Sequence, residues 1–193
     1  MFAVVTATIV VSALFSVAPM VADAGLCGEF RWSIKSLADA DRGDIDFDPI
    51  RTSLADLYGQ EPPDTVSENT PRIAEELHTY SVAARLVRGH IEGDSDVKFV
   101  ISVPGHPHQT MAVEFLGKPC MERRFHRNQM LAARSKALDM CGPLTEDYTR
   151  LRGRVRLVGV GFWGNRSHGE IGGAPNAFQL IPVLSIRDTC RQP

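Results

Sequence analysis

The chain lacks the cysteine and histidine spacings that hold a structural zinc ion. Its four cysteines are Cys27, Cys120, Cys141 and Cys190; none forms a Cys-x-x-Cys pair or lies beside a histidine at zinc-finger spacing. It also lacks a Gly-x-Ser-x-Gly sequence, and its six histidines are scattered. We therefore expect no structural zinc and no serine nucleophile of the hydrolase type, and we predict no resident metal, cofactor or catalytic residue.

Charged side chains are absent from residues 1–22, and residues 2–21 are mostly aliphatic. The sequence Val21-Ala22-Asp23-Ala24 places small residues at the two positions that a signal peptidase reads. This pattern predicts a secretory signal over residues 1–24, cleaved after Ala24, which would leave no stable membrane span. An uncleaved anchor is the alternative, because the run is about as long as a membrane span. We expect a secreted or extracytoplasmic protein with two disulfides.

The rest of the chain divides into two parts of opposite charge. Residues 25–76 contain five basic and twelve acidic residues, whereas residues 77–193 contain 16 basic and 10 acidic residues. The acids between Asp39 and Asp48 lack the glycine and terminal glutamate of an EF-hand loop, so we interpret them as a solvated surface. We predict an acidic N-terminal arm and linker over 25–76 and one domain over 77–188.

Alternating apolar residues predict three successive strands, at residues 80–86, 97–103 and 110–115. Such alternation is typical of strands with one buried face. Residues 122–140 have helix-forming composition and are followed by Gly142, which suits a helix end. Strands resume at 151–162 and 178–186, and Pro182 in the last of them should lie at an edge or a bulge.

The order of three strands, a helix and two strands resembles the OB-fold, a small five-stranded Greek-key barrel. We therefore expect a mainly β fold, with an OB-like barrel following the acidic arm. A five-stranded sandwich or open sheet carrying one helix is the alternative. Ligands of OB-type barrels meet the face of strands two and three and the loops joining strands one to two and four to five. The fold alone does not fix a function.

Both of those loops are polar and rich in glycine here, at residues 89–96 and 164–176. The second is much longer than most connections, and loops of that length are commonly functional. The candidate ligand-binding residues in the two loops are His168, Asn165, Glu170, Asn176, Glu92, Asp94 and Asp96. The alternative for His168 and Asn176 is that they hydrogen-bond the loop's own backbone.

Two functions are consistent with these loops. We favour a non-catalytic extracellular binding module for an unknown ligand. The alternative is a metal-dependent phosphodiester hydrolase that uses Glu92, Asp94 and Asp96, because carboxylate oxygens suit calcium or magnesium. Asp and Gly also commonly form turns, so we expect these acids to make a turn.

Arg150, Arg152, Arg154 and Arg156 recur at period two, which would place them on one face of the fourth strand. A basic stripe of this kind is typical of proteins that bind a phosphate backbone. Single-strand binders also offer stacking aromatic residues, and the second and third strands hold only Phe99 and Phe115, both on the apolar face. We expect the acidic arm to neutralise the stripe, so nucleic acid or another polyanion is not the partner we favour.

Several blocks of the sequence resemble a group of uncharacterised bacterial secreted proteins. The resemblance covers most of the chain after the apolar segment and is carried by Cys27-Gly28 with Arg31-Trp32, Asp94-Ser95-Asp96 before a strand, and the block from Val158 to Ile186 containing His168-Gly169 and Ala174-Pro175-Asn176. It implies export and no particular activity.

The resemblance has two further implications. The group tends to have an acid and a histidine where this chain has Gln179 and Ile181, so any chemistry of those residues would be lost here. It also tends to have cysteines matching Cys27 and Cys120 but not the other two. This implies the pairing Cys27–Cys120 with Cys141–Cys190.

Overall fold

The computed structural model describes residues 27–28, 30–166 and 170–193. The strands in these ranges are β1 (Asp46–Arg51), β2 (His78–Ile91), β3 (Val97–Val103), β4 (His106–Phe115), β5 (Thr149–Arg150), β6 (Arg154–Trp163) and β7 (Phe178–Asp188). The α-helices are α1 (Trp32–Lys35), α2 (Leu54–Tyr58) and α3 (Arg127–Cys141). Short 3-10 helices lie at η1 (Ala40–Asp44), η2 (Ala74–Leu77) and η3 (Lys118–Met121).

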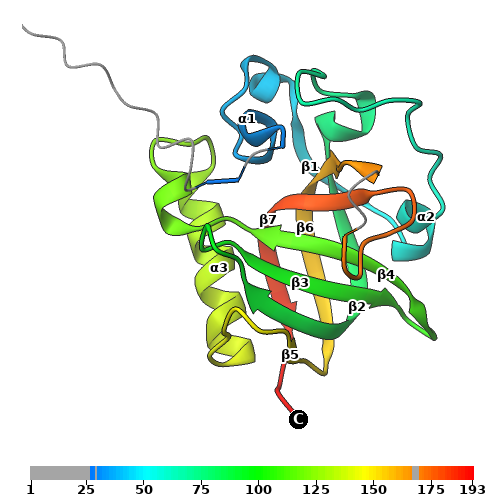
Figure 1. The fold of residues 1–193 in the computed structure, drawn as a ribbon, viewed down its shortest axis with the longest axis vertical. Coiled ribbons are helices and arrows are strands. Elements are labelled where there is room, and N and C mark those ends of the chain that lie inside the picture. The colour runs from blue at the N-terminus through cyan, green and yellow to red at the C-terminus, as the bar shows by residue number, and fades with distance from the viewer. Residues whose placement is uncertain (1–26, 29, 167–169) are drawn as a thin grey trace, which may run out of the picture.

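The strands form one mixed sheet in the order β1-β2-β3-β4-β7-β6, with β5 paired to β2 (Figure 1). Strand β2 also pairs with β6, so the hydrogen bonding runs from β2 through β3, β4, β7 and β6 back to β2. The β1–β2 and β4–β7 pairs are parallel, and the others are antiparallel. The protein is mainly β, as predicted, and all five predicted strands are present with α3 between the third and fourth of them.

Strands β1 and β5 were not predicted from the sequence. In β1, five of the six side chains are exposed and Pro49 interrupts the run, so no alternation marks the segment as a strand. A proline is tolerated there because β1 is an edge strand that pairs only with the start of β2, where Asp46 lies opposite His78 and Arg51 opposite Ser81. The predicted arm therefore supplies one strand of the sheet.

Apolar side chains pack in two clusters on opposite sides of the strands. The inner cluster draws on all five strands of the closed ring, through residues such as Val82, Phe99, Val113, Leu157 and Leu180. The outer cluster joins Ile34 and Leu37 of the arm and Met130 of α3 to Val160 of β6 and Leu184 of β7. Burial on both faces explains why every residue of β3 and the first seven residues of β7 are buried.

Helix α3 begins at Arg127, later than the predicted residue 122. Arg123 and His126 have positive φ angles of 56° and 55°, a left-handed conformation that interrupts an α-helix. The helix ends at Cys141 before Gly142, as expected. It contributes Met130 to the outer cluster and Ala133 and Ala137 to the inner one, so its apolar residues do not form one narrow stripe.

Two disulfides, Cys27–Cys120 and Cys141–Cys190, join the chain as predicted. Pro182 lies at an irregularity of the β6–β7 ladder, between the partners of Gly159 and Gly161, which confirms its predicted place at a bulge. Among the described residues, no helix is long and apolar enough to cross a membrane. The predicted signal over residues 1–24 lies outside the described residues.

Candidate functional site

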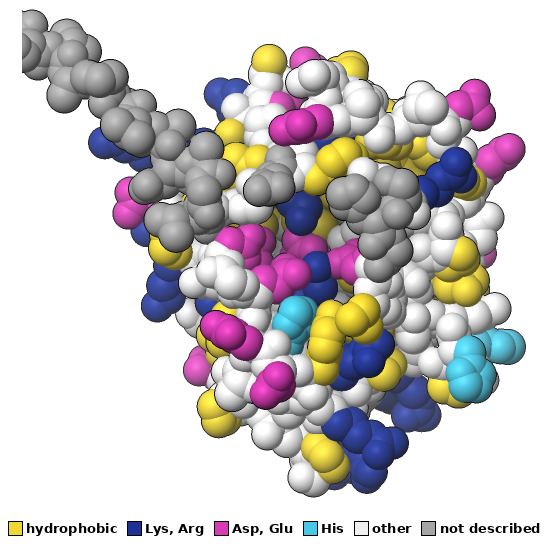
Figure 2. Space-filling model, viewed as in Figure 1, with side chains coloured by type: hydrophobic (Ala, Val, Ile, Leu, Met, Phe, Trp, Pro, Cys, Tyr) yellow, Lys and Arg dark blue, Asp and Glu magenta, His cyan; other side chains and the backbone are white. Residues whose placement is uncertain are grey.

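A cluster of buried and half-buried charged side chains lies where two loops meet the outer side of β3 and β4. Its members, called here the ion cluster, are Lys35, Glu92, Asp96, Lys98, Glu114 and Glu170. Figure 2 shows acidic and basic side chains gathered in a hollow near the centre of the visible face. Lys98 and Glu114 lie directly opposite each other on β3 and β4, and the remaining members come from α1 and from the β2–β3 and β6–β7 loops.

Lys98 connects the parts of the ion cluster. Its Nζ lies 2.7 Å from Glu92 Oε1 and 3.0 Å from Glu114 Oε1, and it forms a third ion pair with Glu170. The other oxygen of Glu114 lies 2.9 Å from Lys35 Nζ. The Lys98 ammonium thus holds the β2–β3 and β6–β7 loops to the sheet.

The charges within the ion cluster shift one another's pKa values. Burial lowers the pKa of Lys98 and Lys35, but nearby carboxylates together outweigh this and raise both above the usual lysine value: Glu114 for Lys35, and Glu114 with Glu170 and Glu92 for Lys98. Burial opposes ionisation of Glu114 as well, yet Lys35 and Lys98 hold its pKa below the usual range. Burial and the Glu114 charge raise the pKa of Glu92. At neutral pH, two ammonium groups therefore neutralise Glu114, which suits binding and positioning more than proton transfer.

Three carboxylates of the ion cluster have the spacing of a cation site. Oxygens of Glu92, Asp96 and Glu114 all lie within 4.8 Å of one another, and oxygen ligands suit calcium or magnesium. Lys98 already contacts two of the three carboxylates. A metal ion would therefore have to compete with the Lys98 ammonium for these carboxylates.

A cavity of about 460 Å³ opens beside the ion cluster. Its polar side includes Lys35, Lys98, Glu170 and Gln179, its apolar side includes Phe30, Phe162 and Pro175, and Arg166 also lines it. We call it the Lys98 cavity. Gln179 is 7% exposed, and its Oε1 has no hydrogen-bond partner among the described residues. A buried acceptor without a partner is costly, so this oxygen is a candidate contact for a bound molecule.

The arm segment that flanks the Lys98 cavity is held in place by Arg31. Its guanidinium forms two 2.6 Å contacts with the Glu76 carboxylate, and both side chains are fully buried. Glu76 also accepts a hydrogen bond from the Trp163 N–H at 2.8 Å. These bonds fix Phe30 and Lys35 relative to the end of β6.

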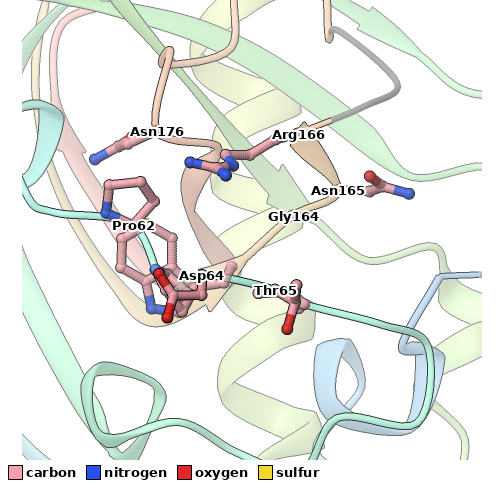
Figure 3. A pocket seen from close by; sticks show the side chains of 10 residues that line it. Pro62, Asp64, Thr65, Gly164, Asn165, Arg166 and Asn176 are labelled. Atoms are coloured by element: carbon pink, nitrogen blue, oxygen red, sulfur yellow. The ribbon is translucent and has the colours of Figure 1, made fainter.

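A second cavity, of about 250 Å³, lies on the other side of Arg166, against the linker before η2. Figure 3 shows Arg166 on one side of it and Asp64 and Thr65 on the other. Asn165 and Arg166 line both cavities. The β6–β7 loop therefore separates two spaces with one shared wall.

The structure gives the predicted loop residues different roles. Glu92 and Glu170 meet at Lys98, and Asn165 lines the cavities. Asn176 is buried: its Nδ2 donates to the carbonyl oxygens of Leu57 and Gln60, and its Oδ1 accepts from the Phe178 N–H. His168 lies outside the described residues.

Asp94 and Asp96 shape the β2–β3 turn. The Asp96 N–H donates to Asp94 Oδ1 at 3.1 Å, and the Gly117 N–H donates to Asp96 Oδ1 at 2.5 Å. A Cβ at Gly117 would lie 2.7 Å from the Asp94 carbonyl oxygen, so this approach requires glycine. Burial, together with the charges of Glu114 and Asp94, raises the pKa of Asp96 to about 8.

Sequence reasoning missed Lys35, Lys98, Glu114, Arg166 and Gln179. The sequence does contain a signal for Lys98 and Glu114. Both alternate with core residues and so lie on the outward face of their strands, yet their neighbours on that face, Val100 and Ala112, are apolar. Apolar residues on the outward face indicate that this face is also covered, so the charged residues among them must be buried and paired.

Comparisons with models of protein families, with curated proteins and with solved structures find no match for this chain. The resemblance to a secreted bacterial group therefore stays a prediction, and the function has to be inferred from the geometry of the site.

Proposed function

We propose that the protein is a non-catalytic extracellular binding module whose ligand site is the Lys98 cavity. The observation that carries this proposal is the cavity itself, about 460 Å³ of space with apolar and charged sides and the unpartnered Gln179 oxygen. Its volume is in the range of small-molecule sites, which are typically mostly apolar with a few placed polar groups. The two disulfides and the predicted secretory signal support an extracytoplasmic location.

The proposal includes an OB-type barrel formed by the ring β2-β3-β4-β7-β6. Its support is the closed strand order and the position of α3 between the third and fourth ring strands. In such barrels, ligands meet strands two and three and the loops between strands one and two and four and five. Here those elements are β3, β4 and the loops that carry Glu92 and Glu170, all of which meet at the ion cluster.

The proposed ligand is a small molecule with an apolar body and an anionic group. Phe30, Phe162 and Pro175 offer apolar surface. Lys98 is already paired with three carboxylates, whereas Arg166 forms no ion pair within the described part of the chain. A guanidinium binds carboxylates through two parallel hydrogen bonds, and the Gln179 oxygen would accept a hydrogen bond from the ligand.

The test is a thermal-shift and calorimetry screen of aromatic and aliphatic carboxylic acids with the full chain. Arg166→Ala and Gln179→Leu should fold normally, because Arg166 is exposed and Gln179→Leu removes an unpartnered polar group. Both should weaken binding by about tenfold or more, whereas the exposed control Arg51→Ala should leave it unchanged. Ligands that bind both variants as tightly as the unsubstituted protein would place the site elsewhere.

A metal-dependent phosphodiester hydrolase is the second candidate, favoured by the spacing of Glu92, Asp96 and Glu114. Single- and double-stranded DNA with calcium or magnesium would test it. Cleavage that disappears in Glu92→Gln with Asp96→Asn would establish the hydrolase and end the proposal of a non-catalytic module. We expect no cleavage, because Lys98 already pairs with Glu92 and Glu114.

A further inference from the structure

Arginines lie directly opposite one another on three adjacent strands of the sheet. Arg85 of β2 pairs with Arg154 of β6, and Arg156 of β6 pairs with Arg187 of β7. These four residues, called here the arginine face, include three exposed side chains and the half-buried Arg156. Arg152 and Arg191, bridged beside them, extend the same charge.

This arrangement is unfavourable unless something neutralises it. Cross-strand neighbours have Cβ atoms about 4.5–5.5 Å apart, and like charges at such positions destabilise a sheet. Within the described residues, no ion pair involves any of the four arginines. The expectation that the acidic arm neutralises the stripe is not met in the described residues, because Asp39 pairs with Arg72 and β1 lies beside the start of β2.

The arginine face borders an open groove of about 490 Å³. Arg85, Arg154 and Arg156 line it together with Pro104 and Gly105 of the β3–β4 turn, and Asp188 is the one acidic residue among its described lining residues. Figure 2 shows basic side chains gathered at the end of the molecule where Figure 1 places the C-terminus. A groove flanked by guanidinium groups suits a linear polymer that presents anionic groups at intervals. Each planar guanidinium can bind one such group through two hydrogen bonds.

The surroundings of the groove offer neither stacking surface for single-stranded bases nor an anchor for lipid tails. The exposed large apolar residues among the described ones are Ile50, Phe125 and Ile171, and none lies on the strands that carry the arginine face. Single-stranded nucleic acid would need aromatic residues for stacking, and insertion into a membrane would need an apolar anchor. We propose that the arginine face binds a linear anionic polysaccharide through its sulfate or carboxylate groups. This site is separate from the Lys98 cavity.

Binding of the full chain to immobilised heparin and polygalacturonate, at increasing salt, tests the proposal. The two probes distinguish sulfate from carboxylate recognition, and binding to at least one should weaken steeply with salt, as polyanion binding does. Arg85→Gln with Arg154→Gln should reduce the affinity by about tenfold and flatten its salt dependence. Thermal stability should stay equal or rise, because the substitution removes a repulsive pair.

The matched control is Arg51→Gln with Lys136→Gln, which makes the same change in net charge at exposed positions outside the groove. It should change the affinity by less than about twofold. Equal loss in both double variants would show that binding depends on net charge alone and would overturn the proposal. Tighter binding to single-stranded DNA or to phosphatidylglycerol vesicles than to either polysaccharide would overturn it too.

Discussion

Asp96 shows how a residue chosen for its chemistry can have a structural role. The sequence Asp94-Ser95-Asp96 before a strand predicted a ligand contact or a turn, and the hydrogen bonds of both acids lie within the turn and to Gly117. Local sequence reveals the turn, because Asp and Gly favour it. It does not reveal Gly117, which is distant in the chain and reaches Asp96 only once β3 and β4 pair.

The raised pKa of Asp96 predicts a pH-dependent effect of Asp96→Asn. The carboxyl titrates near 3.8 in an unfolded chain and at about 8 in the folded protein. Between these values the folded protein keeps a proton that the unfolded chain has lost, so stability falls as pH rises. Asn removes this titration and still accepts from Gly117. Its stability relative to the unsubstituted protein should therefore improve from about pH 5 to about pH 8, as measured by chemical denaturation.

The exposed residue Asp64 offers the control. Asp64→Asn should shift stability by the same small amount at both pH values. If the difference between Asp96→Asn and the unsubstituted protein were also constant, Asp96 would be ionised throughout.

Among the elements, the strands with alternating apolar residues were predicted well, whereas β1 and the start of α3 were not. Alternation is a property of the strand's own residues, so residues 97–103 could be recognised without knowing their neighbours. Strand β1 forms because its residues pair with the edge of β2. The start of α3 is set by the left-handed backbone at Arg123 and His126, which the composition of the segment does not predict. The meeting of the two loops at Lys98 likewise depends on tertiary contacts that no local pattern contains.

Lys98 joins β3, β4 and two loops, so substituting it should affect how these elements hold together. Lys98→Met should lower the free energy of unfolding by about 3–5 kcal/mol, because buried carboxylates lose their shared partner. Calcium should then raise the melting temperature of Lys98→Met, since Glu92 and Glu114 lose their Lys98 partner and lie close enough to Asp96 for the three carboxylates to bind a divalent cation. Differential scanning calorimetry with and without calcium measures both effects.

Two comparisons complete this test. Lys136→Met, at an exposed position of α3, should change neither stability nor the response to calcium appreciably. A melting temperature of the unsubstituted protein that rises with calcium as much as that of Lys98→Met would show that Lys98 does not occupy the cation's place.

At the scale of the whole molecule, the arm and the sheet are joined by buried charge. Because the Arg31 and Glu76 side chains are fully buried, Glu76→Ala leaves the guanidinium without its carboxylate partner and the Trp163 N–H without an acceptor. The free energy of unfolding should fall by about 3–5 kcal/mol. Urea denaturation measures this, with the exposed Glu68→Ala as control, for which we expect a change within about 0.5 kcal/mol. Similar values for both variants would mean that the pair does not secure the arm.

Charge composition predicted an acidic arm and a basic body, but not how they meet. Opposite net charges suggested contact between Asp39–Asp48 and the arginine stripe. In the structure Asp39 pairs with Arg72 of the linker, and β1 pairs with residues 78–81 of β2, before Arg85. Net charge therefore gave the sign of each surface, while strand pairing decided which surfaces meet.

The two disulfides also determine how the protein would carry a mechanical load. Cys27 is bonded to Cys120 just before α3, and Cys141, the last residue of α3, is bonded to Cys190 near the C-terminus. A pull on the chain before Cys27 and after Cys190 would therefore pass through the two bridges and the segment 120–141. The sheet, the Lys98 cavity and the arginine face lie outside this covalent path, so tension would stretch α3 and leave both proposed binding surfaces unloaded.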